Sequence, residues 1–212
     1  MTVTEAAERL THMLKQLAKA PSVDWRTTDH VVAMPLGSWR AARAMYVARG
    51  DRSGSRMAYS EGVLEIMSPS WNHEFIKKNI ARLLESWALK EDINLQGAGS
   101  WTLESSKSEV LVEPEECYLI GPRAGRSLPE LAIEVRWTGG GIEKLPIYAA
   151  LGVKEVWVWD KGAISAHVLR GSTFVRSARS TLLPSLDLRR LAKHASMEDQ
   201  SKAVRAFLKL KR

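Results

Sequence analysis

Short apolar runs alternate with a helical pattern along the middle of the chain. Residues 131–133 are a brief apolar run that ends on the carboxylate of Glu134, and residues 155–159 form a second β-rich run. Between them a helical pattern extends over 142–151 and stops at Gly152. A strand–helix–strand order of this kind predicts a parallel or mixed sheet.

The same two periodicities predict further elements on both sides of this unit. A hairpin is expected over 57–67, with Glu65 on its second strand, and an amphipathic helix over 71–90. Further helices are expected over 2–20, 36–47, 186–191 and 197–210, and further strands over 95–103, 110–120 with an interruption at Pro114, 163–169 and 173–176. The pattern predicts an α/β fold with a central mixed β-sheet flanked by helices, an N-terminal helical arm and a C-terminal helix.

A chain of 212 residues is long enough to bury one substantial core. We expect a single domain with an N-terminal helical extension over 1–50 and a core over 51–180. Residues 181–212 are expected to form a basic C-terminal helical extension of the same domain.

The charge is distributed unevenly along the chain. The net charge is +7, and from Lys161 onward the acids are Asp187, Glu198 and Asp199 against twelve Lys or Arg residues. Such an excess favours a polyanionic partner, although it fits a solvated basic face equally well.

The cysteine content and the hydropathy predict a location. Cys117 is the single cysteine, so no disulfide can form within the chain, and a reducing compartment is expected. No apolar run approaches membrane-spanning length, and the first ten residues carry no apolar stretch of the signal-peptide kind. We therefore expect a cytoplasmic protein without a membrane partner.

Three carboxylates lie at or near predicted strands: Glu65, Glu115 and Glu134. Carboxylate oxygens are the ligands that Mg²⁺ prefers, and two converging carboxylates with water make a typical site. Lys144 is expected in or just before the first turn of the central helix, because Pro146 fits only near a helix start. A lysine beside such a site can stabilise charge on a phosphate. Spacing alone equally allows each glutamate to be a solvated residue at a strand end.

Three stretches of the chain together resemble one known family. They are GVLEIMSPSWNH, VEPEECYLI and PELAIEVRWTGGGIEKLPIYAALGVKEVWVWD, and they occur in this order between Met57 and Leu169. This part of the sequence is similar to the Uma-type putative restriction endonuclease family, a bacterial family in the PD-(D/E)XK nuclease superfamily. The resemblance implies a restriction-endonuclease-like core, with residues 51–180 as its catalytic part.

The resemblance also implies roles for particular residues. Glu115 and Glu134 would bind the metal ion, with Glu65 as a further ligand. Lys144 would stabilise the transition state and orient the attacking hydroxide. His73, at the start of the helix over 71–90, would support the site as a neighbour of these groups, although a purely structural role fits it equally well.

Two positions depart from the pattern of the family. Glu115 follows Pro114 where the family usually has aspartate, and the extra methylene moves the carboxylate by more than about 1 Å. Arg136 stands two residues after Glu134, where the superfamily normally has its lysine. The resemblance implies that Lys144 takes this role from the following helix. Arg136 can bind phosphate but cannot act as a base, because it stays protonated.

We therefore expect Mg²⁺-dependent hydrolysis of phosphodiester bonds in DNA, with Mn²⁺ as a substitute ion. The basic C-terminal region and the loops at the site would contact the DNA, and a homodimer is compatible with the resemblance, because many nucleases of the superfamily work in pairs. Two alternatives stay open. One is a nucleic-acid-binding or interaction module that kept the fold and lost the chemistry, which the departure at Glu115 motivates. The other is a metal-dependent hydrolase that acts on another substrate.

Overall fold

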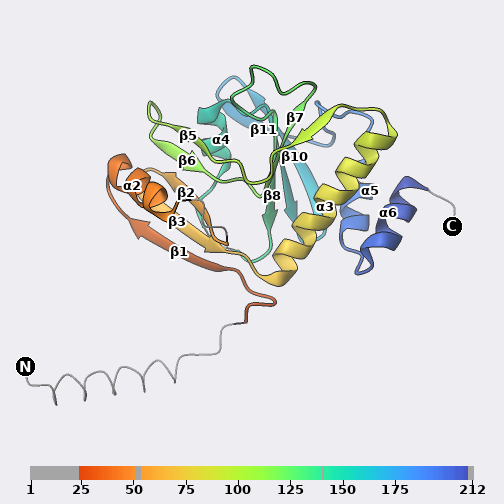
Figure 1. Cartoon of the computed structure of the whole chain (residues 1–212), viewed down its shortest axis with the longest axis horizontal. Coiled ribbons are helices and arrows are strands. Elements are labelled where there is room, and N and C mark those ends of the chain that lie inside the picture. The colour runs from red at the N-terminus through yellow and green to blue at the C-terminus, as the bar shows by residue number, and fades with distance from the viewer. Residues whose placement is uncertain (1–23, 51–53, 140, 210–212) are drawn as a thin grey trace, which may run out of the picture.

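Figure 1 shows the computed structural model of the chain, which describes residues 24–50, 54–139 and 141–209. The helix expected over 2–20 lies outside these residues. The elements in chain order are β1 (His30–Pro35), α2 (Trp39–Arg49), β2 (Arg56–Ser60), β3 (Val63–Ser68), α3 (Trp71–Lys90), β4 (Leu95–Gly97), β5 (Leu103–Ser105), β6 (Val110–Val112), β7 (Glu116–Ile120), β8 (Leu131–Arg136), α4 (Leu145–Leu151), β9 (Glu155–Asp160), β10 (Ala163–Arg170), β11 (Thr173–Ser177), α5 (Leu188–Ala195) and α6 (Gln200–Leu208). None of the helices among these residues is long and apolar enough to cross a membrane.

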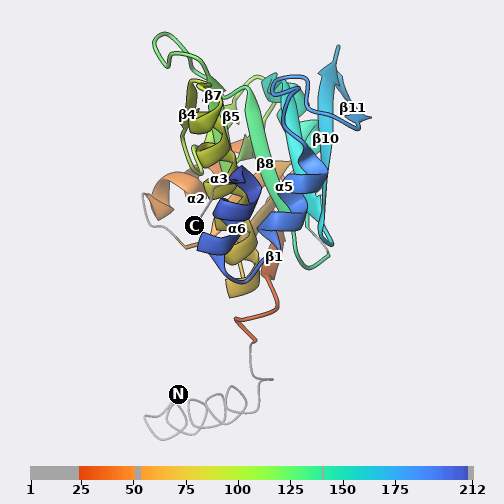
Figure 2. The ribbon, with the colours of Figure 1, turned by 90° about the vertical axis from the view of Figure 1, so that its right-hand side faces the viewer.

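The larger sheet has the strand order β11-β10-β9-β8-β7-β4. β8 and β9 run parallel, with Glu134 opposite Val158, and the other neighbours are antiparallel. On one face lie α3, α5 and α6 (Figure 2), where Leu191 and Phe207 belong to the same core as Ile133 of β8. This arrangement confirms the predicted α/β fold with a central mixed sheet.

The opposite face of the larger sheet packs against α4 and the second sheet. Ile147 and Leu151 of α4 share a core with Ala132 and Val156. Because successive strand residues point to opposite faces, Ala132 and Glu134 share this side of β8. The carboxylate of Glu134 therefore faces the space between α4 and the smaller sheet.

The smaller sheet has the order β1-β3-β2-β6-β5, is antiparallel throughout and packs against α2. It adds a layer that the sequence pattern did not predict. The sequence pattern does not predict β1, because most of its side chains are exposed and show no apolar alternation. The hairpin expected over 57–67 is present as β2 and β3.

Two expected strands are each divided between the two sheets. The strand expected over 95–103 is wrong as one element, because β4 ends at Gly97 and the φ of +58° at Gly99 turns the chain away. The strand expected over 110–120 separates into β6 and β7. Pro114 lacks the N–H that a continuing ladder needs, so the chain crosses from one sheet to the other at Pro114 and Glu115.

Local signals explain where the two site-bearing helices begin. Ser70 Oγ accepts a hydrogen bond from the backbone N–H of His73 at 3.3 Å, and α3 begins at the predicted residue. Lys144 is the N-cap of α4, with Pro146 in the first turn, as the position of the proline predicts. Gly152 ends α4 with a φ of +83°.

Glu113, just after β6, joins α2 to β2 and to the residue that precedes β5. Its side chain is buried and accepts hydrogen bonds from the Arg49 guanidinium, from Met57 N at 2.8 Å and from Thr102 Oγ1 at 3.2 Å. Breaking a buried ion pair leaves an uncompensated charge, which costs more than losing an exposed pair. This carboxylate is therefore a principal anchor of the smaller sheet.

We predict that Glu113→Gln lowers the free energy of unfolding by about 3 kcal/mol, because Arg49 loses its buried counter-charge. The matched control is Glu104→Gln, whose partner Arg43 is half exposed; its loss should stay below about 1 kcal/mol. Urea denaturation of the three proteins measures both values. Equal losses in the two variants would contradict the anchoring role.

Candidate active site

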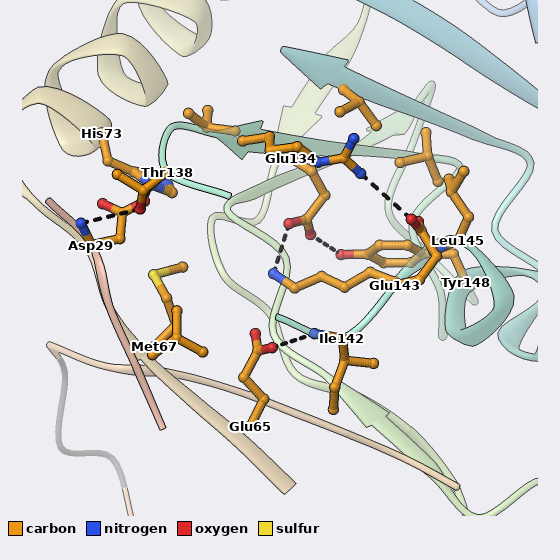
Figure 3. Close-up of a pocket in the computed structure, with 16 residues that line it drawn as sticks. Asp29, Glu65, Met67, His73, Glu134, Thr138, Ile142, Glu143, Leu145 and Tyr148 are labelled. Carbon is orange, nitrogen blue, oxygen red and sulfur yellow. Dashed lines mark hydrogen bonds and ion pairs between the residues drawn. The ribbon is translucent and has the colours of Figure 1, made fainter. Parts of the chain in front are cut away.

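A pocket of about 80 Å³ lies between the two sheets. Figure 3 shows that its walls come from segments far apart in the sequence. They include Asp29 before β1, Glu65 on β3, His73 on α3, Glu134 on β8 and Lys144 at the start of α4. The fold thus brings four of the five predicted site residues to one pocket.

Glu134 has both carboxylate oxygens engaged by the start of α4. Lys144 Nζ donates to Oε2 at 2.7 Å, and the hydroxyl of Tyr148 donates to Oε1. Lys144 and Tyr148 are one helical turn apart, so both side chains reach the same carboxylate. Burial raises the pKa of Glu134, and this effect is larger than the lowering of that pKa by the positive charge of Lys144.

Lys144 brings a positive charge to three acids of the site. Burial lowers the pKa of its ammonium group, but the charges of Glu134, Glu115 and Glu65 outweigh burial and raise that pKa. Lys144 is therefore protonated at neutral pH. It can stabilise negative charge or orient a water molecule, but it is not a general base.

Glu115, the fifth predicted site residue, is not among the residues that line the pocket and lies where the chain crosses between the sheets. It is 1% exposed, and its carboxylate lies 3.2 Å from His73 Nε2, 3.6 Å from Arg56 Nε and 4.0 Å from Lys77 Nζ. Neither carboxylate oxygen has a hydrogen-bond partner within the described residues. Burial raises the pKa of Glu115, but the close approach and charge of His73, together with the charges of Lys144 and Arg56, lower it to about 2. The group is ionised.

Glu65 holds the loop that leads into α4. Its Oε2 accepts a hydrogen bond from the backbone N–H of Ile142. A Cβ atom on Gly141 would lie 2.5 Å from the same oxygen, and Gly141 has a φ of +92°. Only glycine fits both conditions, so the glycine-rich loop is shaped by its approach to Glu65.

His73 lies between two carboxylates. Its Nδ1 is 2.9 Å from Asp29 Oδ2, and its Nε2 faces Glu115. Burial lowers the pKa of His73, but the interactions with Asp29 and Glu115 raise it to about 9. The sequence does not predict Asp29 as a site residue, because it lies in a polar segment without a recognisable spacing.

Arg136, the residue at the usual lysine position, does not contact Glu134 through any hydrogen bond or ion pair among the described residues. Its side chain is half exposed, and Nη2 lies 3.5 Å from Glu143 Oε2 at the pocket rim. The contact with Glu134 is made by Lys144 instead.

The carboxylates fit a magnesium ion by their chemistry. The described residues contain no group of three or more His, Cys, Asp or Glu side chains arranged to hold a metal. Mg²⁺, however, commonly uses one or two carboxylates and completes its shell with water and phosphate oxygens. The buried oxygens of Glu115 lack hydrogen bonds, and the charge of Glu115 raises the pKa of Glu134, as expected of neighbouring carboxylates. Glu115 and Glu134 are the two residues that would hold such an ion.

The α/β architecture, with a mixed central sheet, is that of a restriction-endonuclease-like fold. Carboxylates lie on its strands and a lysine lies at the start of the adjoining helix. The family model Uma2, described as "Putative restriction endonuclease", matches residues 41–191. The chain belongs to this family. The matched region includes Glu65, His73, Glu115, Glu134 and Lys144, whereas Asp29 precedes it. A search of the curated proteins finds no match.

The position of His73 predicts a pH-dependent contribution to stability. A histidine pKa raised from 6.5 to about 9 stabilises the folded protein fully below pH 6.5, and this contribution is lost as the pH rises through about 9. At about 1.4 kcal/mol per pKa unit, the loss is on the order of 3 kcal/mol. We predict that the difference in unfolding free energy between wild type and His73→Gln narrows by this amount over that range. Urea titrations at several pH values measure it, and a difference independent of pH would contradict the ion pairs of His73.

Proposed function

We propose that this chain is a Mg²⁺-dependent endonuclease that hydrolyses phosphodiester bonds in DNA. The observation that carries the proposal is the largely buried pair of Lys144 and Glu134, with Nζ 2.7 Å from Oε2, at a pocket of a Uma2-family protein. Glu115 and Glu134 would hold the ion, and Glu65 would approach it through water. When bound, the ion would polarise the phosphate and lower the pKa of a water molecule.

Hydrolysis requires a water oxygen to form a bond to phosphorus while one P–O ester bond breaks. The water loses a proton, and the departing alkoxide gains one, so the products are a phosphomonoester and an alcohol. Negative charge grows on the non-bridging oxygens as this occurs. The ammonium group of Lys144 stabilises that charge and orients the attacking water, while Glu134 and Tyr148 fix the position of Lys144.

DNA is the proposed partner because of the positive charge of the chain. α5 and α6 carry exposed cations at Arg189, Lys193, Lys202 and Arg205. These helices cover one face of the larger sheet (Figure 2) and α4 packs on the other, whereas Arg136 lies at the pocket itself. A duplex that contacts both Arg136 and the cations of α5 and α6 would have to bend around the edge of the larger sheet. The affinity of the protein for this DNA would fall steeply with salt concentration.

One observation favours a second candidate function, a nucleic-acid-binding module without catalysis. Three cationic side chains lie within 4.0 Å of the Glu115 carboxylate: His73, Arg56 and Lys77. They compete with a metal ion for the same negative charge. Glu115, in place of the aspartate that is usual in the family, also favours the binding module.

We predict that Glu134→Gln and Lys144→Met each lower Mg²⁺-dependent cleavage by about 100-fold or more, because the first removes a charged metal ligand and the second removes the cation that stabilises the transition state. The matched control is Lys154→Met, an exposed lysine paired with Glu130 at the other end of β8 and β9, which should cleave as wild type does. Supercoiled plasmid and labelled single strands, incubated in Mg²⁺, Mn²⁺ or EDTA, measure the rates.

Cleavage that survives both substitutions would assign the activity to a contaminant or to another site. Salt-dependent retention of DNA by all four proteins, without any metal-dependent cleavage, would favour the binding module.

A further inference from the structure

Residues 24–29 connect the two elements that carry the proposed site. The backbone N–H of Trp71, the first residue of α3, donates to Trp25 O at 3.0 Å. On the other side, Trp137 Nε1, just after β8, donates to Thr27 O at 2.7 Å. The segment therefore ties the start of α3 to the end of β8. It lies outside the region matched by the family model.

Asp29 ends this segment with a side chain that is 5% exposed. Its Oδ2 lies 2.9 Å from His73 Nδ1, and its Oδ1 accepts a hydrogen bond from Ser70 N at 2.8 Å. Its own backbone N–H donates to Thr138 Oγ1 at 3.3 Å. Figure 3 shows Asp29 beside His73 at the pocket wall. Both carboxylate oxygens are thus directed at the start of α3.

The contact with Asp29 determines which way the imidazole ring of His73 faces. With Nδ1 directed at Asp29, the remaining nitrogen, Nε2, faces Glu115 at 3.2 Å. A carboxylate that bonds one ring nitrogen commonly fixes the orientation and tautomer of a histidine that acts through the other nitrogen. Without this contact, the ring could rotate away from the buried carboxylate.

We propose that Asp29 is a positioning residue of the site, which acts through His73 to hold Glu115 in place. This inference rests on the proposed function, and it extends the functional unit beyond the part of the chain that the family model matches. Asp29 needs no contact with substrate for this role.

The competing interpretation is that Asp29 merely fastens residues 24–29 to the protein. The substitution Trp137→Phe distinguishes the positioning role from the fastening role, because it removes the hydrogen bond to Thr27 O and leaves Asp29 intact. The aromatic ring is kept, so its stacking on Trp159, at 5.6 Å between ring centroids, can persist. Asp29→Asn is the matched change at the site, since it preserves shape and removes the charge.

We predict that Asp29→Asn lowers kcat for plasmid cleavage roughly 10- to 100-fold with little change in KM, whereas Trp137→Phe retains the wild-type kcat. In a His73→Gln background, Asp29→Asn should cause no further loss of kcat, because Asp29 acts through His73.

Independently of activity, ¹⁵N NMR of the His73 ring at one pH should show a shifted Nδ1 resonance in Asp29→Asn and not in Trp137→Phe. If the amide variant does not fold, Asp29→Glu, which displaces the carboxylate by one methylene, should show the same changes.

Equal losses of kcat in Asp29→Asn and Trp137→Phe, or an unchanged Nδ1 resonance in Asp29→Asn, would overturn the proposal. If wild type cleaves no DNA, the proposed nuclease function fails by itself. The NMR comparison then still decides whether Asp29 positions His73.

Discussion

The structure depends on how it compensates carboxylates that are buried near the junction of its two sheets. An isolated buried charge costs several kcal/mol, so each such group needs a cation or several hydrogen-bond donors. Glu113 has Arg49, which fixes α2 on the smaller sheet, and Glu134 has Lys144, which fixes the start of α4 on the larger one. Glu115 differs, because cations lie close to it but its oxygens form no hydrogen bond within the described residues. Glu113 is therefore a structural carboxylate, Glu115 has oxygens free of hydrogen bonds, and Glu134 would have to share its oxygens between Lys144, Tyr148 and a bound ion.

The candidate site is assembled across both sheets. Glu65 comes from the smaller sheet, Glu134 from the larger one, and Glu115 from the segment that crosses between them. Catalytic groups on strands and helix starts are held more firmly than groups on loops, which suits a site that needs fixed distances. The same arrangement makes the geometry of the pocket sensitive to the packing of the two sheets, since neither sheet alone carries the full set.

The sequence predicted those parts of the fold that depend on local signals. The bounds of α3 follow from the serine cap and the apolar stripe, and the position of Lys144 follows from Pro146 two residues later. The second sheet could not be predicted in this way, because β1 lacks apolar alternation and its pairing with β3 is a long-range contact. The same holds for Asp29, which reaches His73 across 44 residues of sequence. Pro114 was read as an interruption within one strand, although it marks the passage from one sheet to the other.

The most direct test of a two-carboxylate metal centre is a calorimetric titration of Mn²⁺ into the wild-type chain and into Glu134→Gln and Glu115→Gln. A two-carboxylate centre should bind one ion per chain in wild type, with binding lost or strongly weakened in both variants, because each substitution removes a charged oxygen ligand. Binding of the ion with unchanged affinity in both variants, or no binding by the wild-type chain, would contradict it.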